Sequence, residues 1–210
     1  MPSMKILLIA GGWSSEREVS LTGARGMQEA LLKRGHAVTF FDLLENFDEL
    51  LETARQHDFA LINLHGSPGE DGLVQAMLEK ADCPYQGSGP SGSFLALNKA
   101  AAKQIFRMAG LPTADWEFLP VRPAEGWEPR LPWPLFVKTT TGGSSLRLGR
   151  ATNRQELDAL MDEIFAAGEG VLIAAEILHQ AQHGCNSFVI LQPFGCLPNH
   201  VVGRGIVKQL

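Results

Sequence analysis

The chain has 210 residues, with 18 Lys or Arg against 23 Asp or Glu, and a formal net charge of −5. Hydrophobic residues make up 45%, which is typical of an ordinary folded protein with one large or two modest domains. No basic run indicates a nucleic-acid partner, and the apolar start is too short for a signal peptide or a membrane span. Three cysteines at unremarkable spacing are consistent with reduced thiols in a cytosol. We therefore expect a cytoplasmic protein without a nucleic-acid or membrane partner.

The first part of the chain alternates between strand-like and helix-like segments. Strands are expected near 4–10, 36–41, 58–64 and 84–87, and helices near 15–34, 47–56 and 72–81. Ser15 and Glu18 form an S-x-x-E capping box, which predicts the start of the first helix. Alternating strands and helices favour a parallel sheet with helices on both faces, so this part reads as an α/β domain.

A second unit is expected to start at Asn98. Its predicted elements are a helix to 109, strands at 116–119, 134–138, 145–149 and 170–174, and a helix at 153–167. A proline-rich connector at 121–134 separates the first two strands. This order predicts an α+β lobe, and we place the domain boundaries at 1–97, 98–176 and 177–210.

The segment 58–72, DFALINLHGSPGEDG, carries a histidine to the end of a predicted strand. His65-Gly66 and a glycine-rich loop follow the apolar residues, at the sheet edge where open α/β folds bind ligands. The alternative is an ordinary loop with a surface histidine.

The segment 11–20, GGWSSEREVS, follows the first predicted strand. Gly11 and Gly12 allow a tight turn, and the helix start beyond them attracts anions. The spacing is not G-x-G-x-x-G, so a dinucleotide is poorly supported. Glu16 at this edge could bind an ammonium group, or it could only complement the helix dipole.

The segment 131–150 contains Lys138 at the end of a predicted strand, followed by a loop of glycines and hydroxyls at 139–145. Such a loop could bind phosphate oxygens through its backbone N–H groups, and the lysine would add a positive charge. The lysine precedes the glycines, so this is not a Walker A motif.

Together, GGWSSEREVS, the stretch from HGSPGEDG to AGLPT (65–113) and FVKTTTGGSS resemble the D-alanine–D-alanine ligase family of ATP-grasp enzymes. The resemblance covers about residues 4–175. It implies a Rossmann-like pre-ATP-grasp domain and the small ATP-grasp lobe, with the third lobe missing. It also implies ATP-dependent joining of two D-alanines through an acyl-phosphate for peptidoglycan precursors, with Mg²⁺ as cofactor and a homodimer through the amino-terminal domain.

The resemblance assigns roles to the residues at the matching positions. Glu16 would hold the first D-alanine's ammonium group, His65 would lie beside its carboxylate and acyl-phosphate, and Ser144 would hydrogen-bond toward Glu16. For ATP, the matching residues are Lys99, Lys138, Ser144 and Ser145. No residue of this chain matches a metal ligand of the family.

Two further basic residues follow Lys99 on the same helical stripe. We expect Lys103 and Arg107 to form a solvated face without a role in the site.

Several positions depart from the family pattern. Thr139 stands where proline is usual, Gly142 where an acid is usual, and Asn98 where aspartate is usual. Ala174 and Ala175 occupy positions whose acidic or polar side chains contact adenine in the family. The alternative is that Glu176 is a displaced equivalent of these residues, and adenine recognition is therefore expected to differ.

Beyond residue 176 the tail contains no Asp or Glu, so it lacks the oxygen ligands that Mg²⁺ prefers. We expect a truncated or frameshifted end, with a structural zinc site as the weaker alternative. The residues of the zinc-type alternative are His179, His183, Cys185, Cys196 and His200. The functional expectation is a D-alanine–D-alanine ligase. The alternatives are a catalytically incomplete binding module or nonfunctional remnant, and a related carboxylate–amine ligase.

Overall fold

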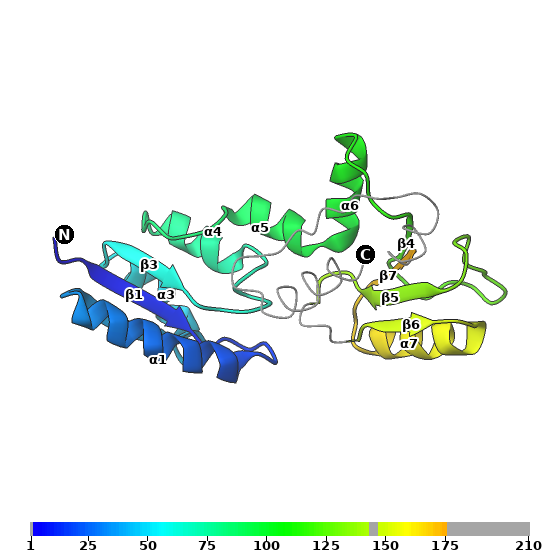
Figure 1. The fold of residues 1–210 in the computed structure, drawn as a ribbon. Coiled ribbons are helices and arrows are strands. Elements are labelled where there is room, and N and C mark those ends of the chain that lie inside the picture. The colour runs from blue at the N-terminus through cyan, green and yellow to red at the C-terminus, as the bar shows by residue number, and fades with distance from the viewer. Residues whose placement is uncertain (1, 143–146, 176–210) are drawn as a thin grey trace. The chain divides into compact units, whose positions relative to one another are not determined.

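The computed structural model describes residues 2–142 and 147–175 (Figure 1). Its contacts divide the chain into two units, Met1–Leu97 and Asn98–Leu210, and each is described by itself. Ser144, Ser145 and the tail with its zinc-type residues lie outside the described ranges. The division into three domains, including the boundary before 177, stays a prediction.

The first unit contains a three-stranded parallel sheet in the order β2-β1-β3. Its strands are β1 (Lys5–Ala10), β2 (Ala37–Asp42) and β3 (Phe59–Ile62). Its helices are α1 (Arg17–Lys33), α2 (Leu43–Asn46), the 3₁₀ helix η1 (Phe47–Glu49), α3 (Leu50–Ala54), α4 (Leu73–Lys80) and α5 (Pro90–Leu97). The parallel pairing confirms the prediction that this unit is an α/β domain.

Alternate residues of the central strand face different helices, as the two-residue period of a strand requires. Leu8 packs toward α1 through the buried Ala24. Leu7 packs on the opposite face with Leu50 of α3 and Leu78 of α4. Both faces of the sheet are therefore covered, and α1 lies along one side of β1 in Figure 1.

The predicted start of the first helix was wrong. The helix begins at Arg17 after Glu16, and no side-chain hydrogen bond caps it. Ser14, rather than Ser15, accepts a hydrogen bond from the Glu16 N–H, at 3.2 Å. Because Glu16 is the N-cap residue, Ser15 precedes the cap position and the predicted capping box does not form.

Two other local predictions differ from the structure. Residues 84–87 form only an isolated bridge between Tyr85 and Ala60, because Pro84 has no N–H to donate to a ladder. The helix α5 was not predicted, although Pro90 at its first position is a recognised helix-start signal.

The second unit contains a four-stranded antiparallel sheet in the order β4-β7-β5-β6. Its strands are β4 (Trp116–Leu119), β5 (Leu135–Thr139), β6 (Gly149–Ala151) and β7 (Val171–Ala175). Its helices are α6 (Lys99–Met108) and α7 (Arg154–Ala166). The α+β prediction is confirmed, although β6 begins at Gly149 instead of 145.

The helix α7 covers one face of this sheet. Its buried Leu157, Met161 and Ile164 pack against Val137 and Ile173. No helix in the described ranges is both long and apolar enough to cross a membrane.

Candidate active site

The first half of the predicted site lies where β1 and β3 end. Glu16 comes after the glycine turn that follows β1, and His65 comes three residues after β3. Both side chains are partly exposed, and neither has a hydrogen-bond partner among the described residues. The two loops approach each other, since a Cβ on Gly66 would lie 3.4 Å from Ser14 Cβ. Parallel strands thus bring the two segments to the same sheet edge.

Ser20 on α1 links these strand ends, and the sequence analysis had not identified it. Its fully buried hydroxyl accepts from the Gly11 N–H at 2.8 Å and donates to the Asn63 carbonyl. The Asn63 side chain donates back to the Ser20 carbonyl at 2.6 Å. Because Ser20 lies one helical turn after Glu16 and Asn63 lies two residues before His65, this network fixes both loops.

A bidentate ion pair between Arg17 and Asp42 lies beside the glycine turn. Arg17 Nη1 and Nη2 lie 2.7 and 2.6 Å from the two carboxylate oxygens of Asp42. The hydrogen bond from Arg17 holds the pKa of Asp42 below its usual range, against the desolvation that raises it. Gly11 has a φ of +78°, and a Cβ there would lie 2.4 Å from Arg17 Nη1. Asp42 ends β2 at the ligand edge, a position that could have indicated it from sequence.

The loop after His65 is built by short-range hydrogen bonds. Asp71 accepts from the Ser67 hydroxyl at 2.5 Å and from the Leu73 N–H at 2.9 Å, so it orders the start of α4. Gly72 has a φ of +93°, and a Cβ there would lie 2.4 Å from the Pro90 carbonyl oxygen. This loop therefore has a defined shape that requires its glycine.

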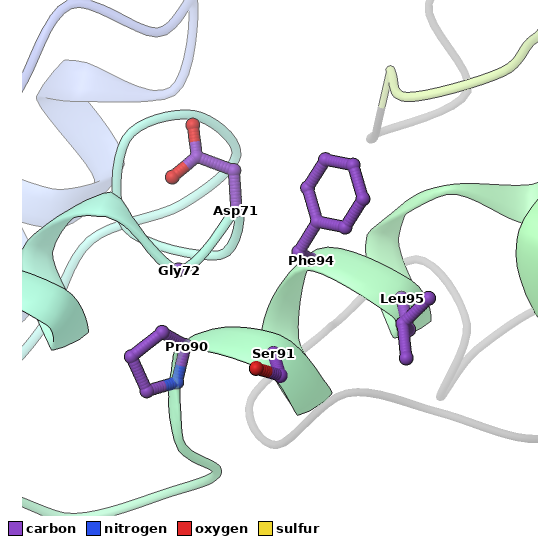
Figure 2. Close-up of a pocket in the computed structure, with 6 residues that line it drawn as sticks. All are labelled: Asp71, Gly72, Pro90, Ser91, Phe94 and Leu95. Carbon is purple, nitrogen blue, oxygen red and sulfur yellow. The ribbon is translucent and has the colours of Figure 1, made fainter.

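An open pocket of about 450 Å³ lies beside this loop (Figure 2). Asp71 and Gly72 line it from the loop, and Pro90, Phe94 and Leu95 line it from α5. Of the predicted site residues that the structure describes, none lines it.

The second half of the predicted site lies in the second unit, around Lys99 and Lys138. Lys99 begins α6, and its backbone N–H donates to the Thr140 carbonyl at 2.9 Å. Its ammonium group donates to the Gly142 carbonyl. Lys138 lies on β5, and burial lowers its pKa. The start of α6 is thereby held against the segment that follows β5, with Lys138 two residues before Thr140.

Two departures from the family pattern are sterically linked. A Cβ on Gly142 would lie 2.2 Å from Thr139 Oγ1, and Thr139 is buried. The segment is also anchored by Thr140, whose hydroxyl donates to the Gly170 carbonyl at 2.8 Å. Thr141 donates to Glu169 at 2.6 Å. With threonine at 139, this conformation leaves no room for a side chain at 142.

The prediction that Lys103 lies on a solvated face was wrong. Lys103 Nζ donates to Thr113 Oγ1 at 2.6 Å and lies 5.1 Å from the centroid of the Trp116 ring. Burial, and next the positive charge of Lys138, lower the pKa of Lys103 to about 8. Arg107 remains exposed but lies 4.8 Å from the same ring centroid. The sequence predicted both the helix and the strand at 116–119, but not that Lys103 and Arg107 pack over Trp116 of that strand.

The positions that depart from the adenine-contact pattern are buried. Ala174 and Ala175 lie on β7, each 6% exposed, and Ala174 lies opposite Trp116 and Phe136 of the neighbouring strands. Among residues 2–142 and 147–175, no group of three or more His, Cys, Asp or Glu is placed to hold a metal ion.

Known proteins resemble the chain in both sequence and fold, although no protein-family model matches it. It is 75% identical over 170 residues to D-alanine--D-alanine ligase of Desulfovibrio desulfuricans, covering 81% of this chain and 56% of that protein. The corresponding ligase of Lawsonia intracellularis is 53% identical over 177 residues, covering 84% of this chain and 59% of the relative.

Solved structures of D-alanine--D-alanine ligase also resemble the chain in fold. D-alanine--D-alanine ligase from Bacillus anthracis matches with a TM-score of 0.74 and 35% identity, over 83% of this chain and 58% of that chain. The structure of the Bacillus anthracis enzyme complexed with ATP matches with a TM-score of 0.71 and 32% identity, over 83% of this chain and 59% of the other.

A parallel α/β unit followed by an antiparallel α+β unit is the arrangement of the first parts of an ATP-grasp enzyme. Over the matched residues, the chain belongs to the D-alanine–D-alanine ligase family. The chain spans 56% of the length of the Desulfovibrio relative.

Proposed function

We propose that the protein to which this chain belongs is an ATP-dependent D-alanine–D-alanine ligase that makes peptidoglycan precursors. The observation that supports this most strongly is the 75% identity over 170 residues to a ligase of that name. The candidate residues Glu16, His65, Lys99 and Lys138 all lie in motifs that match the family in order and spacing.

The D-alanine end of the proposed site uses residues of the first unit. The Glu16 carboxylate would bind the ammonium group of the first D-alanine, and His65 would lie beside its carboxylate. Ser144 would hydrogen-bond toward Glu16 in the closed site. The fixed strand ends around Ser20 support this assignment, because a small zwitterion is oriented only by groups that hold their positions.

The ATP end uses Lys99 and Lys138, with Ser144 and Ser145 as further phosphate contacts. The first D-alanine's carboxylate oxygen would attack the γ-phosphorus of ATP and release ADP. The second D-alanine's amine would then attack the acyl-phosphate carbon, expel phosphate and lose a proton. Positive charge and positioning supply most of the help that phosphoryl transfer requires.

Magnesium accompanies ATP in the proposed reaction. The described residues do not provide a fitting set of oxygen ligands, since no cluster of three candidate side chains occurs among them.

The proposed organisation follows the two units. Residues 1–97 would form the pre-ATP-grasp domain and 98–176 the small ATP-grasp lobe, with 177–210 as an atypical tail. We propose a cytoplasmic location, where ATP is available, and a homodimer through the first unit. A second candidate function is binding of D-alanine without catalysis, through Glu16 and His65 beyond the ends of β1 and β3.

Isothermal titration with D-alanine and with magnesium-ATP, combined with a phosphate-release assay, tests these proposals. D-alanine-dependent phosphate release that Glu16→Gln abolishes would support the ligase. Binding of D-alanine without magnesium-ATP binding would support the second candidate. A folded chain that binds neither ligand would overturn both for this chain.

A further inference from the structure

Lys103 lies over the sheet face of the second unit that is opposite α7. Directly opposed residues of neighbouring antiparallel strands project to the same face. Trp116 and Phe136 both lie opposite Ala174, so they share one face, while Val137 faces α7. Lys103 lies over the Trp116 ring and therefore over this second face.

Lys138 projects from the same face. It lies two residues after Phe136 on β5, and side chains two residues apart on a strand point the same way. The helix α6 reaches both ends of this region, because Lys99 contacts Thr140 after β5 and Lys103 contacts Trp116 on β4. Two partly buried ammonium groups from different elements thus face one region.

Neither ammonium group is neutralised within the described residues. Lys138 has no ion-pair or hydrogen-bond partner among them, and Lys103 has the neutral Thr113 hydroxyl. An ammonium group has three donors, so Lys103 retains two after bonding Thr113. Exposed Asp115 contributes only a long-range attraction, which ranks below the repulsion from Lys138.

We propose that Lys103 is a third cation of the nucleotide site, donating with Lys99 and Lys138 to the phosphate oxygens of ADP or ATP. This inference rests on the proposed function and extends it to a residue outside the matched phosphate lysines. A polyphosphate between the ammonium groups replaces their mutual repulsion with two attractions, in a partly desolvated place where charge interactions are strong.

The proton affinity of Lys103 supports this role. With a pKa of about 8, part of the Lys103 population is neutral at pH 8. A bound phosphate chain favours the charged form, so binding near this pH takes up a proton. The groups facing Lys103 are Lys138 from β5, Arg107 from α6, and Asp115 and Trp116 at β4.

The competing explanation is that Lys103 only supports the Trp116 ring. Arg107 provides a matched control, because it lies over the same ring at 4.8 Å but is exposed. If ring support is the whole role, Lys103→Met and Arg107→Met should behave alike.

The test is calorimetric titration of the chain with ADP at pH 8, in two buffers with different ionisation enthalpies. We expect the wild type to take up roughly half a proton on binding, given a pKa near the working pH. Lys103→Met should abolish this uptake and weaken ADP binding about tenfold. Arg107→Met should change neither quantity, and Lys103→Arg should keep the affinity while losing the uptake.

If folded Lys103→Met binds ADP with the affinity and proton uptake of the wild type, the inference is overturned. The proposed function would still stand in that case, because ADP binds. Absence of ADP binding by the wild type would instead overturn the ATP-binding part of the proposed function. In that case, the role of Lys103 is tested by measuring its side-chain pKa by nuclear magnetic resonance, with and without inorganic pyrophosphate. A raised Lys103 pKa supports the inference, and an unchanged one overturns it.

Discussion

The candidate residues of the first unit and those of the second unit lie in different local environments. In the first unit, buried hydrogen bonds around Ser20 and the Arg17–Asp42 pair fix the strand ends that precede Glu16 and His65. In the second unit, partly buried lysines face one region with little neutralisation. A small zwitterion requires fixed geometry, whereas a polyphosphate requires positive charge, so the difference matches the two proposed ligands.

The largest effect is expected at the loop after His65. Gly72→Ala should lower the free energy of unfolding by about 3 kcal/mol, because it adds a clash with the Pro90 carbonyl to an unfavourable positive φ. Gly35→Ala is the control, since its φ is +84° with no atom within 4 Å of the added Cβ. Its cost should be about 1 kcal/mol. Urea unfolding of both variants measures the difference, and equal costs would contradict the steric explanation.

Removing the buried Ser20 hydroxyl should destabilise the strand ends that precede Glu16 and His65. Ser20→Ala leaves the Gly11 N–H and the Asn63 carbonyl without their partner, at a cost of about 2 kcal/mol. The control is Ser93→Ala, whose hydroxyl bonds the Ser88 carbonyl at an exposed position, and its cost should be a few tenths of a kcal/mol. Ser20→Ala should also weaken D-alanine binding more than ADP binding. Equal weakening of both would indicate general loss of structure.

The ion pair at the glycine turn should contribute a pH-dependent part of the stability. Asp42→Asn should lower the free energy of unfolding by about 1.5 kcal/mol at pH 7, because the ion pair is partly buried and bidentate. The folded-state pKa of Asp42 is below its ordinary 3.8, so its stabilisation is present above that value and is lost as the pH falls further. Denaturation at pH 7 and pH 3 should show a smaller variant effect at the lower pH. Asp162→Asn, in the exposed pair with Arg122, should have almost no effect.

A further pH-dependent effect is expected from the titration of Lys103, reduced by solvent screening because its side chain is only partly buried. Its pKa of about 8 lies below the ordinary 10.5, so between these values the unfolded chain binds more protons than the folded chain. The free energy of unfolding should therefore rise with pH across this window, and Lys103→Met should remove that part of the rise. Urea unfolding at pH 7.5, 9 and 10.5 compares the two proteins. Parallel pH dependences would show that Lys103 titrates normally.

Local pattern predicted much of the fold because the signals were strong where burial was strong. After Lys5, the strand β1 is a continuous run of five apolar residues, and all five are buried. In helix α7, the buried residues Leu157, Met161 and Ile164 are four and three positions apart, as expected for one face of a helix. The start of α1 and the whole of α5 were missed because glycines and serines there fit turns and helix starts equally well.

The alternation of strands and helices and the family resemblance can both be recognised in the sequence, as can the candidate residues Glu16, His65, Lys99 and Lys138. These follow from periodicity and motif order, which are local properties of the chain. The folded structure was needed to show that Ser20 joins two strand ends, that Arg17 pairs with Asp42, and that Lys103 lies beside Trp116 instead of in solvent. Each of those contacts joins separate elements. Their energies depend on burial and distance, which arise only when strand order and register are fixed.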